Sequence, residues 1–127
     1  MLIVGTEYPN RPPSGSLRDG SVFRLCRFGS FRDEGNVAAA FLNCRFEGVE
    51  WHWTLFNGCV FFGCIFDNCA FRSVNFFGCA FVECRFTGCR FLDDSLKGKC
   101  SAEGVRVYAS TAIDCIGEEV LFRERGL

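Results

Sequence analysis

Bulky apolar residues recur at every fifth position through the middle of the chain. The period begins at Phe41 and runs through twelve consecutive units, whose central residues are Phe41, Phe46, Trp51, Phe56, Phe61, Phe66, Phe71, Phe76, Phe81, Phe86, Phe91 and Leu96. An α-helix would turn each one about 140° away from the last, and a strand would send them to opposite faces. A chain that turns once per unit directs all of them toward one axis. We therefore predict short strands joined by regular corners, with these side chains in the core.

The positions around each central residue follow the same period. Two residues earlier, eleven of the twelve positions hold a small residue, and the exception is Asp94; the set is Ala39, Cys44, Val49, Thr54, Cys59, Cys64, Cys69, Val74, Cys79, Cys84, Cys89 and Asp94. Two residues later, ten of twelve hold Gly, Asn, Ser or Asp, which favour turns. Four units would form a square turn, and successive turns would pair as parallel strands ~4.8 Å apart.

These residues resemble the pentapeptide-repeat family, whose unit is a small residue, a polar residue, Leu or Phe, a polar residue and a variable one. The segments 59–63 (CVFFG) and 84–88 (CRFTG) match it well, and the resemblance covers residues 39–98. It implies an all-β fold, namely a right-handed quadrilateral β-helix of about three to four coils. Non-repeat caps are expected at both ends of this solenoid.

The chain is expected to form a single domain over residues 1–127. Residues 1–20 are predicted to be a lead-in and 21–30 a first partial coil, because residues 21–30 contain two further units. Phe28 and Phe41 are thirteen residues apart, which is not a multiple of five. We therefore interpret 29–37 as an inserted loop, 39–98 as three regular coils that stop at Asp94, and 101–127 as a C-terminal cap. Residues 118–125 could form a short helix, acidic first and basic last.

The chain contains ten cysteines, and eight of them fall on the inward small position. Those eight are Cys26, Cys44, Cys59, Cys64, Cys69, Cys79, Cys84 and Cys89. A free thiol packs there as a small hydrophobic group, and the spacing does not suit a structural zinc site. Stacked cysteines one strand spacing apart are also slightly too distant for a disulfide. We expect free thiols, no metal and no cofactor, and assign no role to Cys100 or Cys115.

Charge and motifs limit the classes of function. Lys plus Arg total 14 and Asp plus Glu total 15, whereas proteins that bind nucleic acid usually show a basic patch. We recognise no signal peptide, no membrane span and no catalytic motif, and the single histidine, His52, is read as an ordinary surface residue. The sequence therefore predicts a cytoplasmic bacterial protein that is not an enzyme and contacts neither nucleic acid nor membrane directly.

The period also assigns the outward side chains to four faces of the coil. Residues twenty positions apart share a column, and the column Leu42, Phe62, Val82 on face one is entirely apolar. With Phe77 on face four and His52, Trp53 and Arg72 near face three, these residues form the candidate partner surface. An apolar column is normally covered, and we expect the tail 101–127 to cover it, with a partner or a second copy as the alternative.

The sequence favours a non-enzymatic protein-binding module, in its most specific form a small immunity or resistance protein that sequesters a toxin or inhibitor. A second interpretation follows from the resemblance, because the quinolone-resistance members of the family mimic DNA and bind DNA gyrase. The near-neutral charge and short predicted rod argue against mimicry. A purely structural, self-associating solenoid, for instance a homodimer, is the third interpretation.

Overall fold

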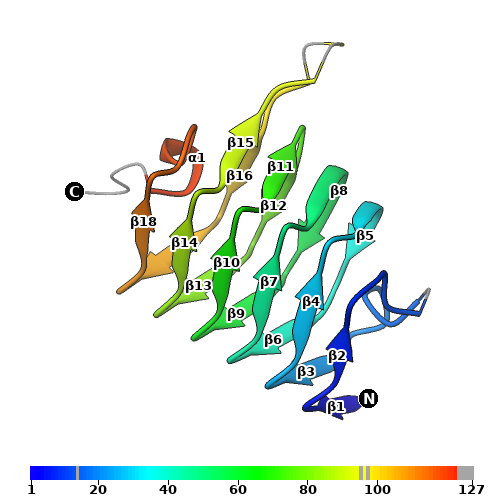
Figure 1. Cartoon of the computed structure of the whole chain (residues 1–127). Coiled ribbons are helices and arrows are strands. Elements are labelled where there is room, and N and C mark those ends of the chain that lie inside the picture. Colours follow the sequence, from blue (N-terminus) through cyan, green and yellow to red (C-terminus); the bar gives the residue numbers. More distant parts are fainter. Residues whose placement is uncertain (14, 95, 97, 123–127) are drawn as a thin grey trace.

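Short parallel strands joined by tight corners wind into a four-sided coil whose turns stack along one axis (Figure 1). The computed structural model describes residues 1–13, 15–94, 96 and 98–122. In these residues the only helix is α1 (Glu119–Phe122), and every strand pairing is parallel. The prediction of an all-β solenoid is confirmed.

Two sides of the coil are six-stranded sheets. The sheet on face one contains, in spatial order, β1 (Leu2–Val4), β3 (Val22–Arg24), β6 (Ala40–Leu42), β9 (Val60–Phe62), β13 (Ala80–Val82) and β17 (Arg106–Tyr108). The sheet on face two contains β2 (Glu7–Tyr8), β4 (Arg27–Gly29), β7 (Arg45–Glu47), β10 (Ile65–Asp67), β14 (Arg85–Thr87) and β18 (Thr111–Ile113). Both sheets therefore run along the whole stack, from the first strands to the last.

The other two sides share a third sheet. Its strands are β5 (Arg32–Val37), β8 (Glu50–Asn57), β11 (Ala70–Arg72), β12 (Asn75–Phe77), β15 (Arg90–Leu92) and β16 (Ser101–Glu103). The long strand β8 pairs with β11 near its start and with β12 near its end, so it turns the corner between face three and face four. Four complete turns begin at β3, β6, β9 and β13, and a half turn lies at each end.

Aromatic rings stack along the axis because each central residue pairs with the central residue of the next turn. Phe66 pairs with Phe46 on one side and with Phe86 on the other. The ring centroids lie 4.8 and 4.6 Å apart, with interplanar angles of 5° and 3°. Rings on neighbouring faces meet edge to face, as Phe61 and Phe66 do at 5.5 Å, a favourable aromatic geometry. Eleven of the twelve predicted central residues are buried.

The cysteines occupy the inner corners of the turns. The eight cysteines that the period placed inward are all buried, and all ten cysteines are free thiols. Their Sγ atoms donate to main-chain carbonyl oxygens of the preceding turn, as Cys64 does to Phe41 at 3.3 Å. Cys100 and Cys115 make the same contact in the last turns, to Phe71 at 3.1 Å and Phe86 at 3.5 Å.

The regular turns do not stop at Asp94, and the prediction that Leu96 lies in the core is wrong. Leu96 is 76% exposed. It lies in an insertion between β15 and β16, where the Asp94 carboxylate accepts hydrogen bonds from the amides of Leu96 and Gly98 at 2.9 and 2.7 Å. Ala102, six positions later, takes the central position opposite Phe76.

The prediction that residues 29–37 form an inserted loop is also wrong. They contain β5, which pairs with β8 through a register shift between Asp33 and Gly35. Asp33 occupies a central position, opposite Trp51. A charged residue there, in a turn two residues shorter than the regular turns that follow it, hides this strand from the five-residue pattern.

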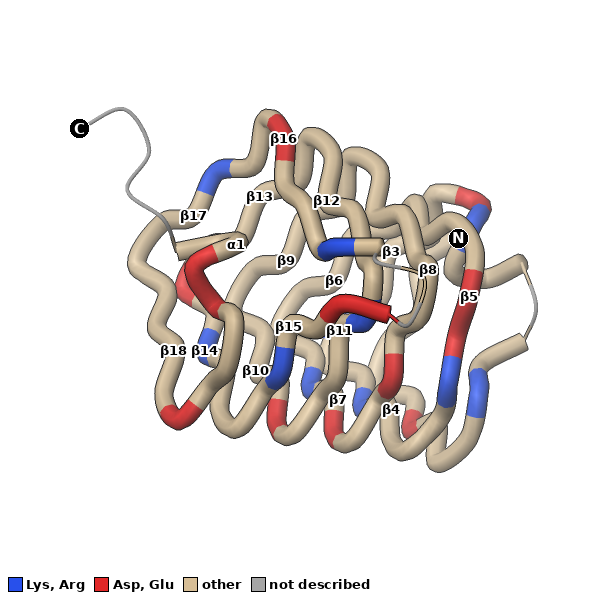
Figure 2. Tube along the Cα trace, turned by 90° about the horizontal axis from the view of Figure 1, so that it is seen from above, with Lys and Arg blue, Asp and Glu red and all other residues tan. Residues whose placement is uncertain are grey.

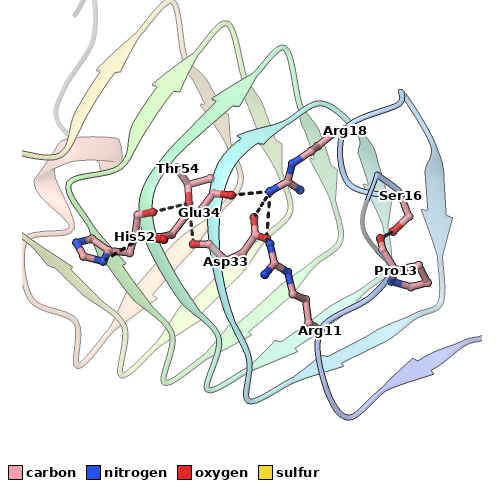
Figure 3. Close-up of polar contacts among 8 residues, drawn as sticks. All are labelled: Arg11, Pro13, Ser16, Arg18, Asp33, Glu34, His52 and Thr54. Carbon is pink, nitrogen blue, oxygen red and sulfur yellow. Dashed lines mark hydrogen bonds and ion pairs between the residues drawn. The ribbon is translucent and has the colours of Figure 1, made fainter.

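The lead-in 1–20 closes the N-terminal end of the core. Strands β1 and β2 stack on β3 and β4, and the ring of Tyr8 stacks on that of Phe28 at 5.2 Å. The following segment brings Arg11 and Arg18 to the buried Asp33, at 2.8 and 3.2 Å (Figure 3). These two guanidinium groups compensate a carboxylate that would be costly to bury alone.

The C-terminal end is closed by smaller residues and by α1. The last strands β16, β17 and β18 have Ala102, Val107 and Ala112 at their centres instead of Phe. Helix α1 packs against this end: Leu121 is buried, and Phe122 meets Phe86 edge to face at 5.6 Å. Residues 123–125 of the predicted helix lie outside the described residues.

The stacked core predicts a large cost for truncating a central ring. Phe66→Ala should lower the free energy of unfolding by about 3–5 kcal/mol, as truncations of buried Phe do. Phe77→Ala is the control, because Phe77 is on the outside and 52% exposed, and it should cost about 0.5 kcal/mol or less. Urea denaturation followed by circular dichroism measures both, and equal costs would contradict the assignment of Phe66 to the core.

The thiols should be protected in the folded protein. Hydrogen bonding to Cys79 and burial raise the pKa of Cys59 well above its usual range, so this thiol stays protonated and unreactive. With an aromatic disulfide reagent at neutral pH, denatured protein should release ten equivalents. Native protein should react only at Cys100 and Cys115, the two that are half-buried, and there more slowly than a free thiol, because burial raises the pKa of both. Rapid native reaction of all ten would contradict the inward position of the corner cysteines.

Candidate partner-binding surface

Face one is apolar over most of its outer surface, and we call it the apolar face. Ten of the twelve outward positions on its strands are apolar, namely Leu2, Val4, Val22, Ala40, Leu42, Val60, Phe62, Ala80, Val82 and Tyr108. The other two are Arg24 on β3, between Val4 and Leu42 in their column, and Arg106 on the last strand, β17. Strands β6, β9 and β13 carry no charged residue (Figure 2). Val60 and Phe62 are each 41% exposed and Tyr108 is 55% exposed.

The structure brings the predicted surface residues together in two groups. Leu42, Phe62 and Val82 are direct neighbours in register across β6, β9 and β13. Phe77 lies apart from them, on β12 of face four. His52, Arg72 and Trp53 form the second group, at face three and its corner.

The described part of the tail, residues 101–122, does not cover the apolar face, contrary to expectation. Strand β17 continues the stack beside β13, and β18 continues it beside β14. Tyr108 thereby adds an exposed aromatic side chain to the column of Phe62 and Val82. Residues 101–122 of the tail thus lengthen the apolar face instead of hiding it.

Face two carries charges that neutralise one another. The guanidinium of Arg45 lies 2.9 Å from the Glu47 carboxylate and 2.6 Å from that of Asp67. Arg27 lies 3.5 Å from Glu47. A shallow cavity of about 270 Å³ lies beside this network, between β2, β4 and β7. Alternating charges give this face no single sign.

Trp53 connects face three with the insertion before β16. Its backbone has a φ of +53°, a left-handed conformation that is unusual for a bulky residue. Its indole Nε1–H donates to the Asp94 carboxylate, and its ring packs against His52 at 4.3 Å. This contact spans 41 positions of sequence, so no local pattern indicates it.

Two further searches of the described residues bear on function. No group of three or more His, Cys, Asp or Glu side chains there could hold a metal ion. In the same part of the chain, no helix is long and apolar enough to cross a membrane.

The five-residue period, the four-sided turns and the stacked Phe columns define a β-solenoid of the pentapeptide-repeat type. No protein-family model and no curated protein matches the sequence. Among solved structures, the chain is similar to full-length QnrB1, a plasmid-mediated fluoroquinolone resistance protein, with a TM-score of 0.55 and 16% identity. A trypsin-treated variant of QnrB1 gives a TM-score of 0.56 and 11% identity.

The extent of these similarities limits their meaning. The match with full-length QnrB1 covers 86% of this chain but only 57% of QnrB1, and that with the trypsin-treated variant covers 90% and 70%. A pentapeptide repeat protein, Rfr23, from the cyanobacterium Cyanothece 51142 matches with a TM-score of 0.42 and 10% identity, over 91% of this chain and 86% of that one. At these identities, the similarity to QnrB1 shows a common fold.

The contact between Trp53 and Asp94 predicts a pH dependence. The indole hydrogen bond, helped by the amide of Gly98, holds the pKa of Asp94 below its usual range. A carboxylate with a lowered folded pKa stabilises the fold above its unfolded pKa, about 3.9, and this contribution is lost as the pH falls through the folded pKa. We expect the Nε1–H resonance of Trp53 to shift with a midpoint below pH 3.9.

Asp94→Asn should abolish this titration, while Asp93→Asn, which changes the neighbouring exposed carboxylate, should leave it in place. Circular dichroism over the same range separates local release from global acid unfolding. A midpoint at or above the usual Asp value would contradict the contact.

Proposed function

We propose that this chain is a non-enzymatic protein-binding module and that its partner docks on the apolar face. The observation that carries the proposal is the continuous apolar surface across β6, β9, β13 and β17, with exposed Val60, Phe62 and Tyr108. Large exposed apolar patches on a protein surface are typical of interaction sites. The sheet beneath is held by the stacked core, so it offers a partner a rigid and nearly flat surface.

The kind of association follows from comparing faces one and two. Burial of apolar area is little affected by salt, whereas attraction between exposed charges is screened. Arg45 already lies between two carboxylates of its own chain. A partner docking on face two would have to replace those ion pairs, whereas docking on face one removes apolar area from water at about 25 cal/mol per Å².

In its specific form, the proposal is a small immunity or resistance protein that sequesters a toxin or inhibitor. Ten free cysteines support the cytoplasmic location expected from the sequence, because thiols persist in a reducing compartment. Self-association through the same face, as a homodimer, is the structural alternative.

Protection of a topoisomerase by DNA mimicry is the second candidate, and the fold shared with the resistance protein QnrB1 favours it. Mimicry of DNA needs a strong negative field. The face two strands carry three acidic and three basic residues, which are Glu7, Glu47, Asp67, Arg27, Arg45 and Arg85. This balance is why we place mimicry second.

One pair of charge-adding variants tests the docking face. Phe62→Glu should abolish partner capture or self-association, because it places a charge at the centre of the apolar face. Thr87→Glu is the control: it adds the same charge at the same strand position on face two. Both variants should remain folded, since neither side chain is in the core. Capture by immobilised protein and sedimentation velocity, at low and high salt, provide the measurements.

Two outcomes would redirect the proposal. If Phe62→Glu binds as wild type does, face one is not the docking surface. If Glu47→Lys is instead the damaging change, binding weakens steeply with salt and wild type inhibits gyrase supercoiling, DNA mimicry is the function.

A further inference from the structure

A hollow of about 180 Å³ lies on face three, away from the apolar face. Its lining residues are Arg32, Glu50, Trp51, His52, Ala70, Arg72 and Arg90. A water molecule takes up about 30 Å³ in the liquid, so the hollow has room for a small polyatomic ion.

The hollow exists because of one small side chain. Ala70 is in register with Glu50 on β8 and with Arg90 on β15. These three residues occupy the same outward column, and strands in a sheet are about 4.8 Å apart. Long side chains therefore surround a position where the column has only a methyl group.

The wall of the hollow is rich in positive charge. Three arginines line it, together with the carboxylate of Glu50. A second carboxylate, that of Glu34, lies 3.8 Å from the guanidinium of Arg32. Among the described residues, the guanidinium of Arg90 has no ion pair or hydrogen-bond partner. Arg72 uses one nitrogen to donate to the carbonyl of Asp93 at 2.9 Å, and a guanidinium has five N–H donors. The donors of Arg90 and most of those of Arg72 are therefore free to bind an anion, whereas Arg32 already contacts His52 and Glu34.

His52 also lines the hollow. Its Nδ1 faces the guanidinium of Arg32, and because an arginine can only donate, Nδ1 must accept. In the neutral imidazole the proton then lies on Nε2. This nitrogen is buried and has no partner among the described residues.

From this geometry we propose that the hollow is a binding site for a small oxyanion of the phosphate class. Arg72 and Arg90 bind the anion through charge-assisted hydrogen bonds, and Ala70 provides the room. The charge of Arg32 is offset by its ion pair with Glu34. Glu50 opposes the anion and limits its affinity. The site is independent of the apolar face, so a variant such as Phe62→Glu should bind the anion normally.

Titration of the full chain with inorganic phosphate at constant ionic strength, set with chloride, tests the site. Saturable shifts of the amide resonances of Ala70, Arg72 and Arg90 are expected. Arg90→Gln should weaken binding about tenfold, the value of one charged hydrogen bond. Glu50→Gln should tighten it severalfold by removing repulsion. Ala70→Leu should abolish it without changing the charge.

Arg85→Gln is the matched control. Arg85 is an exposed arginine in the same turn, at the equivalent strand position on face two, and its removal should leave the phosphate affinity unchanged. Glycerol 3-phosphate in place of inorganic phosphate distinguishes a phosphate monoester from the free ion, and binding of either supports the site. The proposal is overturned if no shift saturates, if Arg85→Gln weakens binding as much as Arg90→Gln does, or if Ala70→Leu still binds.

Discussion

The stacking of one central side chain on the equivalent side chain of the next turn is the interaction on which the whole structure depends. Phe46, Phe66 and Phe86 share a column with ring separations of 4.8 and 4.6 Å, which is the spacing of the hydrogen-bonded strands themselves. Ring stacking and strand pairing therefore demand the same register. A slip by one position would break both at once and turn the rings outward. The arrangement of the outer faces follows from this agreement between core and ladder.

The sequence predicted the fold wherever that agreement is unbroken. From Phe41 to Phe91 the period assigns both the inward and the outward positions. The prediction failed where the chain departs from the five-residue period. The insertion before β16 moved the central position from Leu96 to Ala102. The sequence alone does not distinguish an exposed leucine from a buried one. Ile3 and Tyr8 keep the period of Phe23 and Phe28, but two isolated units were too few to reveal the first half turn.

The candidate site also has a part that the sequence could predict and a part that it could not. The column Leu42, Phe62, Val82 could be predicted because it follows from the period. The sequence could not predict whether the tail covers this column, because the answer depended on Val107 and Ala112 entering the core as further central residues. The contact of Trp53 with Asp94, and that of Asp33 with Arg11 and Arg18, join segments that only the folded coil brings together. Periodicity identifies columns, but it does not identify contacts made by the irregular segments.

Stacking also restricts which side chains the outer columns can carry. Residues of one column repeat about every 4.8 Å, so like charges in neighbouring turns repel each other. Arg27 and Arg45 are such neighbours on face two, and the structure compensates them with Glu47 and Asp67 from the adjacent column. An apolar column avoids the repulsion altogether but leaves a surface that water solvates poorly. Face two and face one are thus two solutions to one constraint. Only face one leaves exposed apolar area that a partner could bury.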